Sequence, residues 1–242
     1  MSNIVIIEDF WDYGDIHRAT QALFDAVDKA GLKFAICYED QTLRFMVDNG
    51  HLSAGEVYDH GQTVMQTLDA LWFGESAYLK HDARPVLLTF GPQYFTSASD
   101  WERLMAGLDP TPALVTLDNH TESAGVGSFP WPPMHAGKDG VLTEAALIGY
   151  LEGFYRKAQV WEVLVAGAFP GFHDIYAEAG VGSSYGYLDA QEGATFRLTL
   201  DLALAQQPDV IQLITWNDYG EGTMIEPTAE FGTRYLEMVQ DV

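Results

Sequence analysis

The sequence predicts an α/β fold, a (β/α)8 TIM-barrel-like fold, and three observations lead to this prediction. Short runs rich in apolar and β-branched residues alternate with helical patterns along the whole chain, which is typical of parallel β/α units. Polar and aromatic residues follow almost every one of these runs. The length of 242 residues suits one barrel domain. We count seven strand candidates where a closed barrel has eight, so one barrel strand is unaccounted for.

The seven strand candidates are short apolar runs bounded by turn or polar residues. The fifth is the weakest, because the link before it carries no helical pattern. In chain order the candidates are Ile4–Ile7, Lys33–Tyr38, Pro85–Phe90, Ala113–Leu117, Val126–Trp131, Trp161–Ala168 and Val210–Thr215.

Helices are predicted wherever apolar residues recur at a 3.6-residue spacing. Asp15 can cap the first helix and Gly31 stops it, whereas Ser99 with Glu102, and Asp189 with Glu192, have the spacing of capping boxes. The predicted helical regions are 15–30, 53–73, 99–108, 143–158, 189–207 and 229–239. No repeat, low-complexity segment or linker divides the chain, so residues 1–242 are expected to form a single catalytic domain.

Composition excludes several classes of partner. A formal charge of −23, from 35 acidic against 12 basic residues, repels phosphate backbones and anionic membrane surfaces, so no nucleic acid and no membrane is expected as a partner. No apolar run approaches the roughly 20 residues that span a bilayer. No secretory signal is visible in the chain as given, which predicts a cytoplasmic protein unless the true N-terminus is missing from this sequence. The single cysteine, Cys37, excludes an internal disulfide and is expected to be a buried apolar residue.

The residues that follow the predicted strands point to an enzyme. Because parallel strands point the same way, their carboxyl ends meet on one face of a barrel, where catalytic residues lie. The clusters are Glu8–Tyr13, Glu39–Gln41, Gln93–Phe95, Asp118–His120, Phe129–Trp131, Phe172–Asp174 and Asp218–Glu221.

The last strand leads into the most informative stretch of the chain, Ile214–Thr228, which carries Asp218, Glu221 and Glu226. Cleavage of a glycosidic bond needs a pair of carboxyl groups: one protonates the leaving oxygen, and the other activates water, attacks directly or assists a sugar hydroxyl. The alternative is a helix N-terminus, which also favours acids. Capping, however, requires neither aromatic rings nor the glycines found here. Asp218 and Glu221 are therefore the predicted catalytic pair.

The segment Trp216–Glu221 resembles a signature of glycoside hydrolase families 71 and 99 and their bacterial family 71/99-like (WbsX-like) relatives. Tyr78–Leu88, Pro170–Phe172 and Gly222–Pro227 resemble further stretches of this group in the same order. The resemblance implies a β/α barrel that hydrolyses α-linked glycans, because family 99 contains endo-acting α-mannosidases and family 71 cleaves α-1,3-glucan. It also implies that Glu221 is the general acid and Asp218 its partner.

The resemblance leaves the substrate and the start of the chain open. An Asp at position 218 is the family 71 choice, whereas the stretch Gly222–Pro227 resembles family 99, so neither mannan nor glucan is assigned. The first barrel strand of the family should precede Ile4. The expectation is therefore either an N-terminally truncated chain or a trimmed barrel.

Sugar binding is expected of residues that combine flat rings with hydrogen-bonding groups. The C–H face of a sugar packs on an aromatic ring while its hydroxyls bond to acids and amides. Loop acids facing water and rings packed under loops would show the same pattern. The candidates are Trp11, Glu39, Asp40, Tyr94, Asp118, Trp131, Trp216, Asn217, Tyr219 and Glu226. The expected partner is a carbohydrate, no cofactor and no metal are expected, and the oligomeric state is not assigned.

Two other functions compete with a glycosidase. The first is a metal-dependent hydrolase, because histidines and acids follow several strands, but no HxH or HExxH spacing supports it. The residues concerned are Asp9, Glu39, Asp118, His120, His173 and Asp174. The second is a non-catalytic glycan-binding or polysaccharide-biosynthesis protein, which the missing strand favours and the intact pair of Asp218 and Glu221 opposes.

Overall fold

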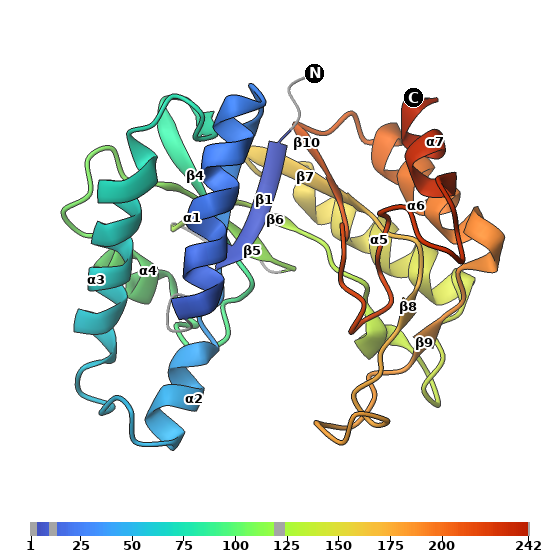
Figure 1. The fold of residues 1–242 in the computed structure, drawn as a ribbon, viewed down its shortest axis with the longest axis horizontal. Coiled ribbons are helices and arrows are strands. Elements are labelled where there is room, and N and C mark those ends of the chain that lie inside the picture. The colour runs from blue at the N-terminus through green and yellow to red at the C-terminus, as the bar shows by residue number, and fades with distance from the viewer. Residues whose placement is uncertain (1–3, 10–13, 119–123, 242) are drawn as a thin grey trace. The chain divides into compact units, whose positions relative to one another are not determined.

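A computed structural model of the protein describes residues 4–9, 14–118 and 124–241 (Figure 1). The chain forms two compact units, Met1–Ser128 and Phe129–Val242. Each unit has its own buried core and its own strands. The catalytic single-domain organisation of residues 1–242 stays a prediction.

The first unit is built on parallel strands. Its strand order is β1 (Ile4–Asp9), β2 (Lys33–Tyr38), β4 (Arg84–Thr89), β5 (Ala113–Leu117) and β6 (Gly125–Phe129). The pairs β1–β2, β2–β4 and β4–β5 are parallel, and a short strand β3 (Lys80–His81) runs antiparallel to β4. Every described residue of β2 after Lys33 is buried, which explains its continuous apolar sequence.

Helices accompany the strands of the first unit. α1 (Gly14–Lys29) packs on β1 and β2, and α3 (Val57–Leu68), which continues into the π-helical turn Asp69–Phe73, packs against α4 (Ala98–Leu104) (Figure 1). A further helix, α2 (Thr42–Asp48), lies in a stretch for which no helix was predicted. The buried core includes Phe34, Ile36, Trp72, Leu87 and Trp101.

The second unit contains two parallel strands, β7 (Val163–Ala168) and β10 (Val210–Leu213), in which Val210 pairs with Val165. Short strands β8 (Phe172–His173) and β9 (Tyr187–Leu188) form an antiparallel pair. The helices are α5 (Glu144–Ala158), α6 (Ala194–Ala205) and α7 (Arg234–Gln240), with 3-10 turns at Met134–Ala136 and Gln191–Gly193, and α6 packs on β7. Two buried clusters, around Leu151 with Phe154 and around Phe196 with Leu200, form its core.

All seven predicted strands are present among the described residues and alternate with helices, so the predicted fold class is confirmed. Cys37 is buried as expected. In the part of the chain that the structure describes, no helix has both the length and the apolar character needed to cross a bilayer.

Three predicted helix caps are wrong. Asp15 lies inside the first turn of α1 instead of before it. The capping box of α4 is formed by Ser97 and Asp100, so Ser99 lies inside the helix. Ser97 with Asp100 and Ser99 with Glu102 have the same spacing in the sequence. Only the extended backbone at Ser97 identifies Ser97 as the cap. Near α6, Gly193 holds the N-cap position and the Asp189 carboxylate accepts from the Gln191 amide instead.

Candidate active site

The loop after β10 closes on itself and forms the base of the candidate site. The Thr215 amide donates to the Thr223 carbonyl oxygen at 2.9 Å, and the Ile225 amide donates to the Thr215 carbonyl oxygen at 2.9 Å. The hydroxyls of the two threonines lie 2.8 Å apart, and the Glu226 amide donates to the Trp216 carbonyl oxygen. These bonds hold the intervening residues 217–222 in one conformation.

Asp218 and Glu221 are joined within this loop. The Glu221 amide donates to Asp218 Oδ1 at 2.9 Å, and the Asp218 amide donates to Thr215 Oγ1 at 3.1 Å. Both residues are partly buried. The three-residue spacing noted in the sequence thus has a structural consequence, because the side chain of Asp218 orients the backbone that carries Glu221.

Each carboxylate oxygen of Glu221 accepts a hydrogen bond from an aromatic side chain. The Tyr176 hydroxyl donates to Oε1 at 3.1 Å, and Trp131 Nε1 donates to Oε2 at 3.4 Å. Burial and the charge of Glu221 raise the pKa of Tyr176 above its ordinary value, so the hydroxyl keeps its proton and remains a donor. Two donors from separate segments therefore orient the carboxylate.

The segment that carries Tyr176 is attached to the Glu221 loop through the backbone. The His173 amide donates to the Glu221 carbonyl oxygen at 2.8 Å, and the Ile175 amide donates to the Gly220 carbonyl oxygen at 3.0 Å. Gly222 allows this close approach: it has a φ of +68°, and a Cβ atom there would lie 2.9 Å from the His173 carbonyl oxygen.

The Asp174 side chain holds the segment that carries Tyr176 through three hydrogen bonds. This side chain is buried, and its carboxylate accepts from the Tyr176 amide at 3.1 Å, the Ser184 hydroxyl at 3.0 Å and the Tyr185 amide at 2.7 Å. Tyr176 was absent from the predicted site, and Asp174 was named only in the cluster after a predicted strand and in the metal alternative. That place after a strand was the signal available for Asp174, whereas the contact of Tyr176 with Glu221 spans 45 residues and has no local signal.

The remaining predicted residues of the last loop lie around the pair. Asn217 is exposed, and Trp216 and Tyr219 are each 53% exposed. The Tyr219 hydroxyl donates to Glu226 Oε1 at 2.7 Å. The structure thus brings Trp131 and Asp218 each into direct contact with Glu221 and adds a Tyr219–Glu226 pair on the same loop.

The other predicted binding residues belong to the first unit. Asp40 is fully buried, and its carboxylate accepts from the amides of Gln93, Tyr94 and Phe95 at 2.8–3.0 Å, so it holds the loop after β4. Burial raises the pKa of Asp40, and the backbone donors oppose that rise. Glu39 is buried, Tyr94 and Asp118 are partly buried, and Trp11 lies outside the described residues. A role of these residues in sugar binding stays a prediction.

The residues on which the metal alternative was based do not form a ligand set where the structure describes them. His120 and the side chain of Asp9 lie outside the described residues. His173 is exposed and packs edge-on against the Tyr187 ring, while Asp174 is occupied by its three donors. Among the described members of this set, no three offer ligand atoms to a common point.

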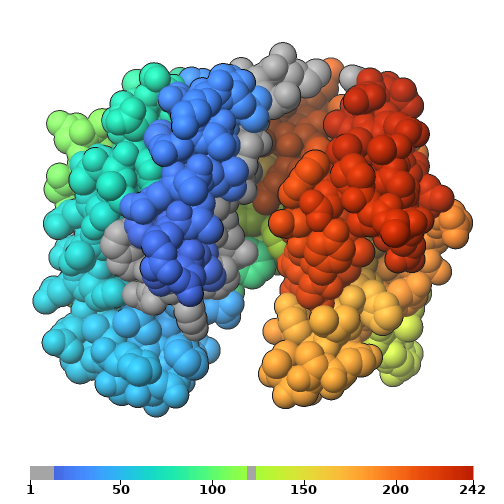
Figure 2. Space-filling model, viewed as in Figure 1, coloured from blue at the N-terminus to red at the C-terminus, as the bar shows by residue number. Residues whose placement is uncertain are grey.

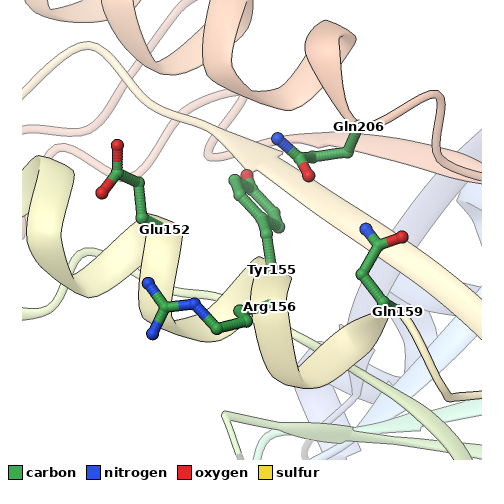
Figure 3. A pocket seen from close by; sticks show the side chains of 5 residues that line it. All are labelled: Glu152, Tyr155, Arg156, Gln159 and Gln206. Carbon is green, nitrogen blue, oxygen red and sulfur yellow. The ribbon is translucent and has the colours of Figure 1, made fainter.

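A shallow depression of about 340 Å³ lies elsewhere on the second unit, beside α5 (Figure 3). Glu152, Tyr155, Arg156, Gln159 and Gln206 line it. The Tyr155 hydroxyl donates to the Gly167 carbonyl oxygen at 3.4 Å and accepts from the Gly167 amide at 3.3 Å, so its polar end serves the packing of α5 on β7. None of the predicted site residues lines this depression.

The fold is a β/α fold of the barrel type, and it is similar to the folds of solved glycoside hydrolase structures. Two structures of the GH99 endo-α-mannosidase from Bacteroides thetaiotaomicron are similar to this chain at 16% identity. The one in complex with bis-tris propane has a TM-score of 0.66 and aligns over 99% of this chain and 79% of its own, and the other has a TM-score of 0.64 over 99% and 74%.

A glycoside hydrolase-like protein is also similar, with a TM-score of 0.69, 13% identity, and coverage of 98% of this chain and 80% of its own. No protein-family model matches the chain, and no curated protein matches it. The resemblance to families 71 and 99 that the sequence indicated is therefore confirmed at the level of the fold.

Proposed function

We propose that the protein is a glycoside hydrolase that cleaves α-linked glycans of the α-mannan or α-1,3-glucan type, with Glu221 as general acid and Asp218 as its partner carboxylate. The observation that carries this proposal is the setting of Glu221. Its two oxygens accept from Tyr176 and Trp131, and its amide is bound by Asp218. A carboxyl group held this way is oriented before substrate arrives, as acid–base catalysis requires.

In the proposed reaction, protonated Glu221 transfers its proton to the glycosidic oxygen as the bond from that oxygen to the anomeric carbon breaks. The leaving sugar departs as an alcohol, and Glu221 becomes a carboxylate. The Tyr176 hydroxyl and the Trp131 N–H donate to the carboxylate that this step produces, and hydrogen bonds to a charged acceptor are about twice as strong as those to a neutral one. Both aromatic residues therefore favour the proton transfer.

Asp218 is proposed to act on the opposite side of the sugar, where it assists the attack of water or of a sugar hydroxyl on the anomeric carbon. One of its oxygens accepts from the Glu221 amide. The same side chain thus sets the position of the acid and supplies negative charge near the developing positive charge of the sugar. Retention or inversion of configuration follows from the separation of the reacting carboxyl groups in the substrate complex.

The substrate is proposed to lie on the exposed rings of Trp216 and Tyr219, with Asn217 and Glu226 bonding to sugar hydroxyls. Trp131 touches the acid itself. In the first unit, the partly buried Tyr94 and Asp118 remain candidates for sugar contacts, whereas Asp40 is fully buried and its carboxylate holds the loop after β4. The endo-α-mannosidase with a similar fold favours an internal cleavage of mannan for this chain as well.

A second candidate function is glycan binding without cleavage. The exposed Trp216 and Tyr219 suit a binding surface as well as they suit a catalytic one. The two candidates differ in whether the bound glycan is cleaved. Only a hydrolase needs the oriented acid Glu221.

The deciding experiment incubates wild type, Glu221→Gln and a control variant, Glu230→Gln, with α-mannan and with α-1,3-glucan, and resolves the product sizes. Glu230 is an exposed carboxylate outside the Glu221 loop, so its substitution should leave cleavage unchanged. We expect wild type and the control to release oligosaccharides and Glu221→Gln to release none. If folded wild type binds a glycan and cleaves neither polymer, the binding function is correct and the hydrolase is not.

A further inference from the structure

The segment between β8 and β9 carries apolar side chains that are exposed to solvent. Ile175 is 51% exposed, Val181 74% and Tyr185 64%. Figure 1 shows this segment extending beyond the two short strands, and Figure 2 shows it, in gold, at the surface. Tyr185 differs from an ordinary exposed loop residue because hydrogen bonds hold the backbone on both sides of it.

Hydrogen bonds hold the chain on both sides of Tyr185. Its own amide donates to the buried carboxylate of Asp174 at 2.7 Å, and the Ser184 hydroxyl donates to the same carboxylate at 3.0 Å. The Gly186 amide donates to Ser184 Oγ at 3.0 Å, and the Tyr187 amide donates to the Gly140 carbonyl oxygen at 2.8 Å. The ring therefore faces solvent from an ordered backbone, so little conformational entropy is lost when a ligand packs on it.

The Tyr185 ring is also connected to the candidate acid. Its centroid lies 5.7 Å from that of Tyr176, edge to face at 84°, and the Tyr176 hydroxyl is the group that donates to Glu221 Oε1. Two side-chain contacts thus lead from the exposed ring to the carboxylate. A glycan held at Glu221 that continues in this direction would reach the ring.

We propose that Tyr185 is a platform for a sugar residue one place beyond the two that flank the cleaved bond, so that the site takes an oligosaccharide chain. The inference rests on the proposed function for the identity of its ligand. An aromatic face offers a sugar's C–H groups a flat apolar surface, and its hydroxyl can bond to the sugar's own. Asp174 supports the platform and the acid together, because it accepts from the amides of both Tyr176 and Tyr185.

The test measures binding in the Glu221→Gln background by calorimetry, with α-mannan and α-1,3-glucan disaccharides and hexasaccharides as the probes. We expect Tyr185→Ala to weaken binding of a hexasaccharide by about tenfold, the size of one aromatic contact, and to leave disaccharide binding unchanged. Tyr185→Phe should retain the affinity. Val181→Ala, a change in the same loop at a more exposed residue, is the matched control and should have no effect. Because the Tyr185 amide makes the structural contact, alanine keeps the loop's hydrogen bond.

An unchanged affinity of Tyr185→Ala for every hexasaccharide, an equal loss for both lengths, or no binding of any probe would overturn the platform. Hydrolysis by wild type is measured separately, so the two proposals can fail independently. Glycan binding that depends on Tyr185 without any turnover would refute the hydrolase and keep Tyr185 as a contact for a glycan chain. If turnover depends on Glu221 but Tyr185→Ala leaves the hexasaccharide affinity unchanged, the hydrolase is supported and the platform is refuted.

Discussion

The Tyr176 hydroxyl lies 3.1 Å from Glu221 Oε1 and donates a hydrogen bond to it, although 45 residues separate the two along the chain. Two sets of hydrogen bonds position Tyr176 for this contact. The amides of His173 and Ile175 donate to the Glu221 loop, and the Tyr176 amide donates to the Asp174 carboxylate. The contact links the loop of Asp218 and Glu221, which the sequence predicted as the site, to the segment that carries Tyr176, which it did not predict.

Tyr176→Phe removes this donor and keeps the ring. We expect kcat on a cleaved glycan to fall about 10-fold to 100-fold, corresponding to the loss of one hydrogen bond to a charged group, with a smaller change in KM. The matched control is Tyr58→Phe, which removes a tyrosine–carboxylate bond of 2.7 Å to Asp100 in the first unit and should leave kcat unchanged. Equal kcat values for wild type and Tyr176→Phe would show that the contact plays no part in turnover.

The raised pKa of Tyr176 predicts a feature of the pH–rate profile of the same variant. Because burial and the charge of Glu221 raise that pKa, the tyrosine stays protonated through the pH range of activity. The alkaline limb of the profile therefore cannot report loss of the tyrosine proton. We expect an alkaline limb in Tyr176→Phe as well as in wild type, and its disappearance in the variant would contradict this assignment.

Two substitutions of Asp218 separate its charge from its hydrogen bond. Asparagine keeps an oxygen that can accept from the Glu221 amide, whereas alanine does not. We expect both variants to lose most activity, and Asp218→Ala alone to lose about 0.5–1.5 kcal/mol of unfolding free energy in denaturant titrations. Near-normal turnover by Asp218→Asn would mean that the residue shapes the loop and takes no part in the chemistry.

Gly222 and Gly180 form a matched pair, because both have a φ of +68°. A Cβ atom at Gly222 would lie 2.9 Å from the His173 carbonyl oxygen, whereas one at Gly180 would meet nothing within 4 Å. Gly180→Ala should cost about 1 kcal/mol of unfolding free energy through backbone strain. Gly222→Ala should cost clearly more and should also lower turnover, since the clash displaces the Glu221 loop. Thermal unfolding and initial rates measure both effects, and identical behaviour of the two variants would refute the crowding argument.

Asp40 predicts a pH dependence of stability in the first unit. Its pKa in the folded protein is raised by burial above the ordinary value of 3.8, so the folded state binds the proton more tightly than the unfolded state does. The resulting stabilisation is complete below the unfolded pKa and is lost as pH rises through the folded pKa. We expect the unfolding free energy of wild type, relative to Asp40→Asn, to fall as pH rises above 3.8. A relative stability that rises with pH would show that the three amide donors outweigh burial.

Local patterns account for the success of the strand predictions. The strands β2, β4 and β7 are nearly continuous apolar runs, and burial on both faces of a parallel sheet requires that composition wherever such a strand lies. The joining of Asp218 to Glu221 is local as well, since the bond closes over three residues. Helix starts were less predictable, because Ser97 and Ser99 each precede an acid by three residues and only one has the extended backbone of a cap.

The sequence by itself determined the order of the seven predicted strands and of most helices, the net acidic charge and the pair of acids after the last strand, because each depends on the composition or on residues that are neighbours along the chain. Only the tertiary structure decided which side chains hold Glu221. Tyr176 and Trp131 reach it from segments 45 and 90 residues away, and the carboxylate of Asp40 proved to bind the backbone of a loop more than 50 residues on. Such contacts arise from the packing of distant segments, and no spacing along the chain encodes them.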